Sequence, residues 1–340
     1  MLQYSHKGGA FMIDLHLHMD GSLIAENIIY LANKQDIALP SQNIETVNAM
    51  LSAPINCSSL NEYLKCFDLP LLVLQSFEAL EYAFYHLVHR LAKEGLIYAE
   101  IRFAPQLHTN SRLTQKRAVE AAISGINTAM KENSSIFAQL ILCAMRGKVN
   151  DTANMETIAV AETFMENGVA AVDLAGAEAL YKTADYSALF RQVSERRIPF
   201  TIHAGEADGA ESVWKAVSFG AKRIGHGVRS VEDEKLVSVL AEQGITLELC
   251  LSSNLQTKAV ASIQEFPLRK FLEKGVKVTI NTDNTTVSQT NIENEFQLLR
   301  DKINLTKIEE KNLLLNSANA AFVSETKREE IISKIIKKYS

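Results

Sequence analysis

The stretch FMIDLHLHMD (residues 11–20) is an apolar run that carries two histidines and two acids. Because side chains alternate along a strand, His16 and His18 share one face, with Cα atoms about 7 Å apart at a rise of roughly 3.3 Å per residue. That spacing lets two imidazoles bind one metal ion, although a pair of hydrogen-bonded core histidines gives the same letters. The stretch alone therefore predicts a strand and leaves the role of its histidines open.

Seven further β-rich runs follow, and most are apolar on both faces, as parallel strands covered by helices are. They are LIYAEIRFA (96–104), IFAQLILCAM (136–145), VAAVDLAG (169–176), IPFTIHAG (198–205), KRIGHG (222–227), ITLELC (245–250) and KVTINTD (277–283). Helical stretches such as EDEKLVSVLAEQG separate many of them, and this alternation predicts a parallel sheet. We therefore expect an α/β fold, a closed (β/α)₈ TIM barrel.

Two regions of the sequence are additional to the eight strands and connecting helices of a minimal barrel. Apolar residues recur at helical spacing within 58–95, which predicts a helical insertion after the first strand. An insertion there lies on the face where a barrel keeps its active site, so a lid and a packing helix pair both explain it. Residues 307–340 predict charged C-terminal helices. The chain has no repeat of solenoid spacing and no linker, so we expect residues 1–340 to form a single domain.

Composition narrows the class of protein. Hydrophobic residues make up 47% and charged residues 22% of the chain, as in ordinary globular proteins. The formal net charge of -5 gives no electrostatic case for binding nucleic acid.

The four cysteines lack a C-x-x-C pattern and fit a cytoplasmic location. The opening MLQYSHKGGA does not resemble a signal peptide, and no apolar run approaches the roughly 18 to 20 residues of a membrane span. We expect neither nucleic acid nor a membrane as a partner, and the oligomeric state stays open.

Three other predicted strands end in polar motifs, namely HAGE (203–206), GHG (225–227) and TDN (282–284). In a barrel, the carboxyl ends of the strands converge on the rim that holds the active site. Three neutral imidazoles and one carboxylate make a good shell for one zinc ion, with a position left for water. We expect the ligands of this single zinc ion to be His16, His18, His203 and Asp283.

Two more titratable residues follow these strands. Glu206 lies in a glycine-containing turn and can serve as a general acid or base, although in isolation a place beside a helix N-terminus explains it better. His226 lies between two glycines, and we place it beside the zinc ligands, where it orients or deprotonates the attacking water, since a fifth protein ligand would close the site. For His86 and His89, helical spacing favours a surface or packing role.

The motifs HLHMDGS, DLAG, HAGE, RIGHG, LSSNLQT and INTDN occur in this order between Asp14 and Ser288. Together they resemble the motifs of the adenosine deaminases of the amidohydrolase superfamily. The resemblance implies a (β/α)₈ barrel with one catalytic zinc ion that hydrolyses adenosine, and 2′-deoxyadenosine as well, to the 6-oxo product and ammonia. It implies the same four zinc ligands, Asp283 being catalytic as well. It also implies that Glu206 shares a proton with purine N1 and that His226 positions the hydroxide.

The resemblance further implies contacts to a purine nucleoside. His18 and Asp20 would bind the substrate, Asp20 at the ribose, and the backbone of Gly176 would meet purine N3. Asn284 stands where the family commonly has a second aspartate, and its amide can donate to purine N7 at any pH. An apolar wall from the insertion would include Leu64 and Phe67.

Two alternatives stay open. Relatives of this family handle adenine, N6-methyl-AMP or aminofutalosine-type nucleosides, whereas Asp20 and the lack of an Arg or Lys cluster in the motifs favour a ribose-bearing substrate without a phosphate. A non-catalytic barrel that binds purine nucleosides would be expected to lose Glu206, His226 or a zinc ligand, and all of these are present. The H-x-E and P-C-x-x-C pattern of the other class of zinc deaminases is absent from the sequence.

Overall fold

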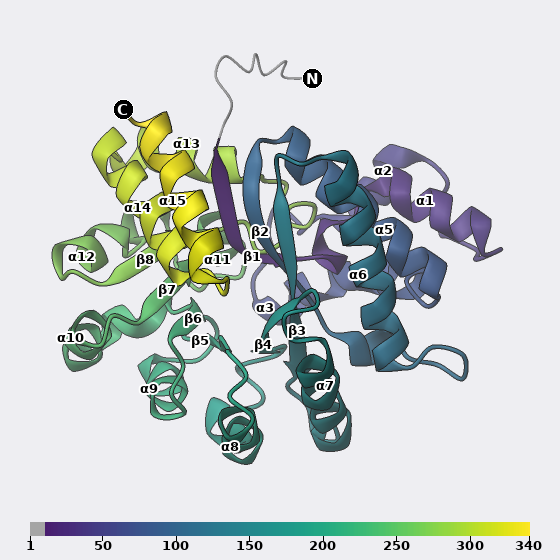
Figure 1. Ribbon diagram of the computed structural model, residues 1–340, viewed down its shortest axis with the longest axis horizontal. Helices are drawn as coiled ribbons and strands as arrows, with labels where there is room; N and C mark the ends of the chain where they lie inside the picture. Colours follow the sequence, from purple (N-terminus) through teal and green to yellow (C-terminus); the bar gives the residue numbers. More distant parts are fainter. Residues whose placement is uncertain (1–10) are drawn as a thin grey trace.

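The computed structural model describes residues 11–340, so the prediction about a signal peptide in the first ten residues lies outside it. The described chain has eight strands: β1 (Met12–His18), β2 (Leu96–Phe103), β3 (Phe137–Met145), β4 (Val169–Ala175), β5 (His203–Ala204), β6 (Arg223–His226), β7 (Thr246–Leu249) and β8 (Lys277–Ile280). They form two parallel four-stranded sheets, in the orders β1-β2-β3-β4 and β5-β6-β7-β8. Parallel bridges join Leu17 to Asp283 and Val172 to Phe200, so both seams between the sheets are closed. The fold is the expected TIM barrel (Figure 1).

The strands are buried on both faces, since one face points into the barrel and the other packs under helices. Every residue of β2 and of β4 is buried. The predicted strand 198–205 is a regular strand only over its last part, His203–Ala204. Pro199 has no N–H to donate to a ladder, and pairing with β4 there is reduced to one bridge, in which Thr201 N–H donates to Val172 O at 3.0 Å.

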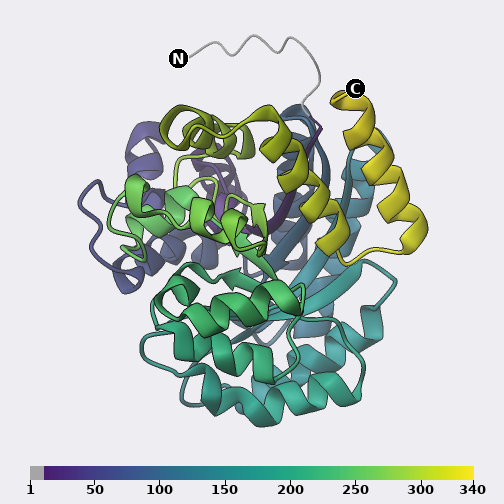
Figure 2. The ribbon, with the colours of Figure 1, turned by 90° about the vertical axis from the view of Figure 1, so that its left-hand side faces the viewer.

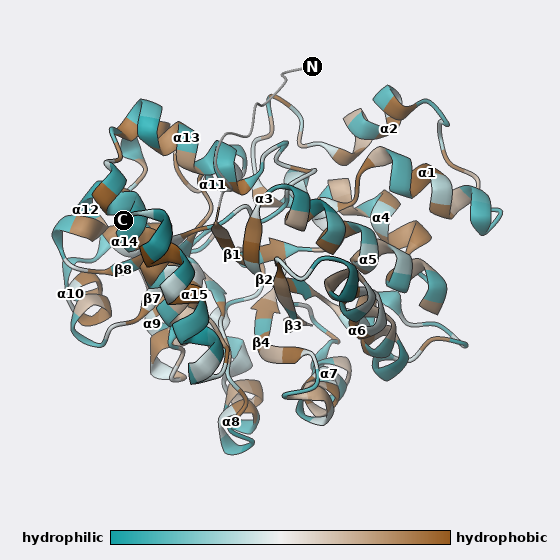
Figure 3. Cartoon of the chain, turned by 45° about the horizontal axis from the view of Figure 1, so that its top comes forward, coloured by the Kyte–Doolittle hydropathy of each residue, from teal (hydrophilic) through white to brown (hydrophobic). Residues whose placement is uncertain are grey.

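Helices surround the strands (Figure 2). The helices after β2 are α6 (Gln115–Glu132), α7 (Asp151–Phe164), α8 (Ser187–Glu195), α9 (Ala210–Ser218), α10 (Glu234–Glu242), α11 (Leu251–Gln256), α12 (Leu268–Glu273), α13 (Ile292–Ile303), α14 (Lys307–Ala320) and α15 (Glu325–Lys338). The buried residues of α6 and α15 are mostly apolar, whereas hydrophilic residues are prominent on the outer faces of these two helices (Figure 3). A single apolar core cluster extends from Met12 in β1 to Ile335 in α15.

The expected helical insertion lies between β1 and β2. It contains α1 (Ala25–Lys34), α2 (Ile44–Leu51), α3 (Leu60–Tyr63), α4 (Asp68–Val73) and α5 (Phe77–Lys93), with a 3₁₀ turn at Leu64–Phe67. Its middle part packs against the loop after β8, where Ala53 N–H donates to Val287 O at 2.9 Å. The hydroxyl groups of Tyr63 and Ser288 are also hydrogen-bonded, at 2.7 Å. The insertion therefore lies over the carboxyl ends of the strands.

The predicted C-terminal helices are present and their limits follow from local capping. Thr306 and Glu309 form a capping box, in which each side chain accepts a hydrogen bond from the backbone N–H of the other, and this starts α14. The side chain of Ser324 accepts from Lys327 N–H and starts α15. Ile331 and Ile335 bury one face of α15 against the barrel. Within residues 11–340, no helix is both long enough and apolar enough for a membrane crossing.

Candidate active site

A cavity of about 220 Å³ opens at the carboxyl ends of the strands, beneath the insertion. Its polar lining comes from strand ends and the loops that follow them: His18, Asp20, His203, Glu206, His226, Asp283 and Asn284. Its apolar lining comes from the insertion and from β2, β3 and β4 with their loops, and includes Leu60, Leu64, Phe67, Leu71, Leu107, Met145 and Ala175. The cavity thus combines an apolar wall with a few converging polar groups, as small-molecule sites do.

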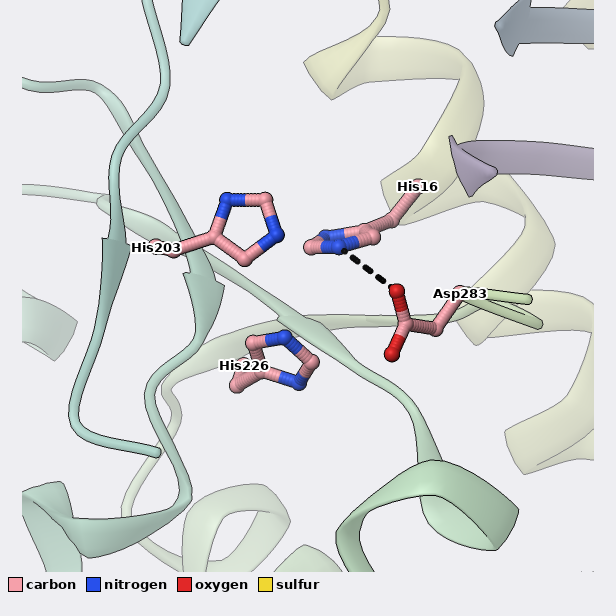
Figure 4. Close-up of side chains that lie close together, drawn as sticks. All are labelled: His16, His203, His226 and Asp283. Carbon is pink, nitrogen blue, oxygen red and sulfur yellow. Dashed lines mark ion pairs between the residues drawn. The ribbon is translucent and has the colours of Figure 1, made fainter. Parts of the chain in front are cut away.

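Five side chains bring nitrogen or oxygen atoms together at the base of this cavity. Ligand atoms of His16, His203, His226 and Asp283 all lie within 4.8 Å of one another (Figure 4). His18 adjoins this group, because its Nε2 lies 3.2 Å from His203 Nε2 and 3.4 Å from Asp283 Oδ1. Two atoms bound to one zinc ion at tetrahedral angles are roughly 3.3 Å apart. The spacing therefore fits a shared metal ion.

The Nδ1 atoms of two histidines lie against carboxylates, so that their Nε2 atoms are left to face a metal ion. Glu248 Oε2 lies 2.8 Å from His16 Nδ1, and Asp173 Oδ2 lies 2.8 Å from His203 Nδ1. His16 Nε2 is buried and has no hydrogen-bond partner, which is rare for a buried polar atom. A carboxylate on Nδ1 fixes the tautomer and aims Nε2 at the metal position. These residues fit a metal ion.

Although burial and the charge of Arg102 lower the pKa of His16, its contacts with Asp283 and Glu248 outweigh them, and this pKa is raised. Burial favours the neutral form of the other three imidazoles of this cluster. It lowers the pKa of His203, and it lowers the pKa values of His18 and His226 well below their ordinary range, although the nearby Asp283 opposes the shift in these last two. A neutral imidazole offers a lone pair, whereas an imidazolium cannot bind a metal. The charge state of these three imidazoles and the geometry of the cluster therefore both suit the binding of a metal ion.

Two buried arginines tie the carboxylates of this site to one another. Arg102 donates to Asp173 Oδ2 at 2.8 Å and to Glu248 Oε2 at 3.0 Å, while Arg223 donates to Glu248 Oε1 at 2.6 Å. Both guanidinium groups also donate to the carbonyl of Leu15, one residue before His16. Although burial raises the pKa of Glu248, Arg223 and Arg102 hold it well below its ordinary value. The network therefore keeps a negative charge beside His16.

Glu206 follows β5 and is 4% exposed. Its Oε1 accepts a hydrogen bond from Thr257 Oγ1 at 3.0 Å, and its Oε2 lies 3.6 Å from His226 Nε2. Burial raises the pKa of Glu206 well above its ordinary value, and the charges of Asp283 and Glu178 add to this. A raised pKa favours the protonated form of a carboxyl group, and that form can act as a general acid.

The backbone at two strand ends adopts the left-handed conformation that only a few non-glycine residues tolerate. His226 has φ 59° and Asp283 has φ 62°. Pairing with β1 holds Asp283 in place, since its N–H donates to His16 O at 2.8 Å and its carbonyl accepts from His18 N–H at 2.7 Å. Ser253 Oγ donates to Asp283 Oδ2 at 2.6 Å, which leaves Oδ1 facing His16 and His18.

The residues predicted to bind substrate all line the cavity, namely His18, Asp20, Leu64, Phe67, Gly176 and Asn284. Asp20 is buried, and burial raises its pKa to about 6. Asn284 Oδ1 is buried without a hydrogen-bond partner. The Asn284 side chain lies directly against Gly21, where an added Cβ would come within 1.8 Å of Asn284 Oδ1. The turn after β1 therefore needs glycine at this position.

His86 and His89 lie on α5, outside the cavity lining, as expected. His89 Nε2 contacts Glu132 Oε2 at 2.9 Å, and the ring of His86 packs against Tyr82.

Several supporting residues were not singled out from the sequence: Arg102, Asp173, Glu178, Arg223 and Glu248. Asp173 and Glu248 each interrupt an apolar strand, VAAVDLAG and ITLELC, and both side chains are fully buried. A lone charge within a buried strand needs a buried partner, and that signal was available in the sequence. The identity of the partner was not, because it depends on which side chains meet inside the barrel.

Comparisons with known proteins place the chain in a family. A family model described as Adenosine deaminase matches residues 12–338. An adenosine deaminase of Haemophilus ducreyi is 49% identical over 331 residues, which cover 96% of each chain. Two solved structures share the fold at lower identity. An adenine deaminase from Arthrobacter aurescens has a TM-score of 0.86 at 24% identity and covers 96% of this chain and 98% of its own. An amidohydrolase from Burkholderia ambifaria with bound zinc has a TM-score of 0.86 at 19% identity, and the match covers 97% of this chain and 92% of that one. Because the family model and the Haemophilus relative span nearly the whole chain, this chain belongs to the adenosine deaminase family.

Proposed function

We propose that this chain hydrolyses adenosine to inosine and ammonia with one bound zinc ion, and that it accepts 2′-deoxyadenosine as well. The observation that carries the proposal is the convergence of Glu206, His226 and Asp283 on a cavity that His18 and His203 also line, with His16 beside them. Membership of the adenosine deaminase family supports the same reaction.

His16, His18, His203 and Asp283 hold the zinc ion in this proposal. The support is a donor set of imidazoles and one carboxylate, which zinc prefers, together with the 3.2 to 3.5 Å spacings between their atoms. Zinc lowers the pKa of water and so supplies a nucleophile near neutral pH. His226 stays beside the ligands, with its Nε2 facing Glu206.

The side chains of the cavity divide the proton transfers between them. Glu206 is protonated because of its burial, and it donates its proton to purine N1, which draws electron density away from C6. His226 and Asp283 orient the attacking water and accept one of its protons. That proton passes to the amino group, which leaves as ammonia, and the second proton of the water returns to Glu206 as the C6 carbonyl forms. The apolar wall keeps bulk water away from these transfers.

The rest of the lining holds the nucleoside. His18 contacts the substrate, Asp20 binds the ribose, the backbone of Gly176 meets purine N3, and the Asn284 amide donates to purine N7. Leu64 and Phe67 cover the base. Among the described residues, the cavity lining contains no Lys or Arg, and a phosphate would need such a partner. The lining therefore favours a nucleoside over a nucleotide.

We also propose that residues 1–340 form a single domain and that the protein works in the cytoplasm. The continuous apolar core from β1 to α15 supports the first proposal. The four cysteines, which are all buried and unpaired, support a reducing compartment. The oligomeric state stays open.

A substrate panel with metal analysis tests the proposed function. We expect adenosine to have the highest kcat/KM among adenosine, deoxyadenosine, adenine, AMP and N6-methyl-AMP, measured by the ultraviolet change as the 6-amino group is lost. Elemental analysis should find one zinc ion per chain. Clearly faster turnover of adenine or of a nucleotide contradicts the substrate assignment, whereas bound zinc without turnover of any 6-aminopurine would indicate a binding protein.

A further inference from the structure

We propose that Glu178 is a positioning residue for Glu206, which fixes the backbone of the turn that carries this acid. The inference rests on the role of Glu206 in the proposed function. Glu178 lies in the loop after β4, two residues past the DLAG motif, and it is 1% exposed. It is not among the residues that line the cavity, so it acts through Glu206 and does not touch the substrate.

The carboxylate of Glu178 accepts five hydrogen bonds, four of them from consecutive backbone N–H groups of the neighbouring loop. The donors are Gly205 N (2.7 Å), Glu206 N (3.0 Å), Ala207 N (2.7 Å), Asp208 N (3.0 Å) and Ser212 Oγ (2.5 Å). Four N–H groups that point to one side form a concave anion site, and hydrogen bonds to a carboxylate are stronger than those between neutral groups. The turn thus takes its shape from a charge on another loop.

The arrangement differs from an ordinary helix cap. Helix α9 begins after Gly209, which has no side chain with which to cap it. The carboxylate reaches across from the loop after β4 and serves the turn that precedes the helix. Gly205 has φ 71°, and a Cβ there would lie 2.6 Å from Val213 Cγ2, so this turn requires glycine at position 205.

The side-chain carboxyl group and the backbone N–H of Glu206 are therefore each held by a separate hydrogen bond. Thr257 Oγ1 holds the carboxyl group at 3.0 Å, and Glu178 holds the backbone N–H at 3.0 Å. A general acid must lie within about 2.6 to 3.2 Å of the atom that it protonates, and a misplacement of about 1 Å can cost 100-fold in rate. Loss of the Glu178 charge therefore affects the proton transfer more than the binding of the nucleoside.

The substitution Glu178→Gln tests this, because the amide has nearly the same shape but turns an NH₂ group toward backbone N–H donors on one side. We expect kcat to fall about 10- to 100-fold. The KM for adenosine, the affinity for inosine measured by calorimetry, and the zinc content should stay close to those of the unchanged protein. If Glu178→Gln fails to fold, Glu178→Asp keeps the charge, shortens its reach and serves the same comparison.

Asp233→Asn is the matched control. Asp233 accepts the N–H groups of Lys235 and Leu236 and the indole N–H of Trp214, outside the cavity. The Asp233→Asn substitution should lower the melting temperature and leave kcat unchanged. A similar fall in kcat for both variants would make the effect of Glu178 a general loss of stability and would overturn the inference.

A double substitution separates positioning from a structural role. If Glu178 acts through Glu206, adding Glu178→Gln to Glu206→Gln should not reduce the small residual turnover further, although it still lowers the melting temperature. Equal kcat losses in both backgrounds, or an unchanged kcat in Glu178→Gln alone, would overturn the inference while leaving the proposed function in place. Near-normal turnover of Glu206→Gln would instead contradict the proposed role of Glu206, and the role of Glu178 with it.

Discussion

At the level of single residues, two candidate metal ligands each pair with a carboxylate from another strand. His16 in β1 meets Glu248 in β7, and His203 in β5 meets Asp173 in β4. The candidate ligands could be singled out from the sequence, because a histidine or aspartate at the end of an apolar strand is unusual. Their partners were not predicted, because the sequence gives the face of a strand but not which side chains meet across the interior. Glu178 was missed for the same reason, since its donors belong to another loop.

Glu248→Gln should weaken metal binding about 10- to 100-fold, because the charge that orients His16 is lost. The affinity is measured by competition with a chromophoric chelator. Glu100→Gln is the matched control: Glu100 also pairs with Arg223, at 2.6 Å, but has no hydrogen bond to a histidine. Both substitutions should lower the free energy of unfolding, since each leaves a buried guanidinium short of a carboxylate. Wild-type zinc affinity in Glu248→Gln would show that the carboxylate is not needed for binding.

At the level of elements, the strand order and the helical insertion could be predicted from the spacing of apolar residues along the chain. The residues at which the strands end could not be predicted in this way. The predicted strand 198–205 is shortened by Pro199, and the predicted strand 277–283 ends at Ile280 because the following residues turn towards β1. The helical spacing of apolar residues also could not show whether the insertion is a lid or a packing layer. The contact between Tyr63 in α3 and Ser288 after β8 gives the lid hypothesis a specific point of attachment.

Tyr63→Phe removes that attachment and keeps the ring. A buried hydrogen bond contributes about 0.5 to 1.5 kcal/mol, so we expect KM for adenosine to rise about 2- to 12-fold with little change in kcat. Steady-state kinetics give both values, and hydrogen exchange of residues 57–67 should become faster. Tyr98→Phe is the control, because its hydroxyl donates to Glu100 away from the cavity. An unchanged KM with unchanged exchange in Tyr63→Phe would favour a packing layer over a lid.

At the level of the whole molecule, the barrel consists of two half-sheets that meet at two seams. The candidate metal ligands come from both halves, with His16 and His18 in the first and His203 and Asp283 in the second. The closed barrel could be expected from eight strands alternating with helices. The division into two hydrogen-bonded sheets could not, because it depends on how irregular the pairing is at each seam. A metal ion at this position therefore joins the halves.

Metal removal should lower the melting temperature. A ligand present at 100 times its dissociation constant stabilises the folded state by about 2.7 kcal/mol, which for a chain of this size corresponds to a few degrees. Differential scanning calorimetry before and after dialysis against a chelator measures the change. His16→Ala is the control, and its melting temperature should respond much less to the chelator. Equal melting temperatures with and without metal, once metal loss has been verified, would contradict the bridging role.

The contact between Gly21 and Asn284 limits how this cavity can change during evolution. Any side chain at position 21 would occupy the space of the Asn284 side chain. A side chain at position 21 is therefore open only to lineages in which residue 284 has become smaller, so the two positions should vary as a pair among descendants of this chain.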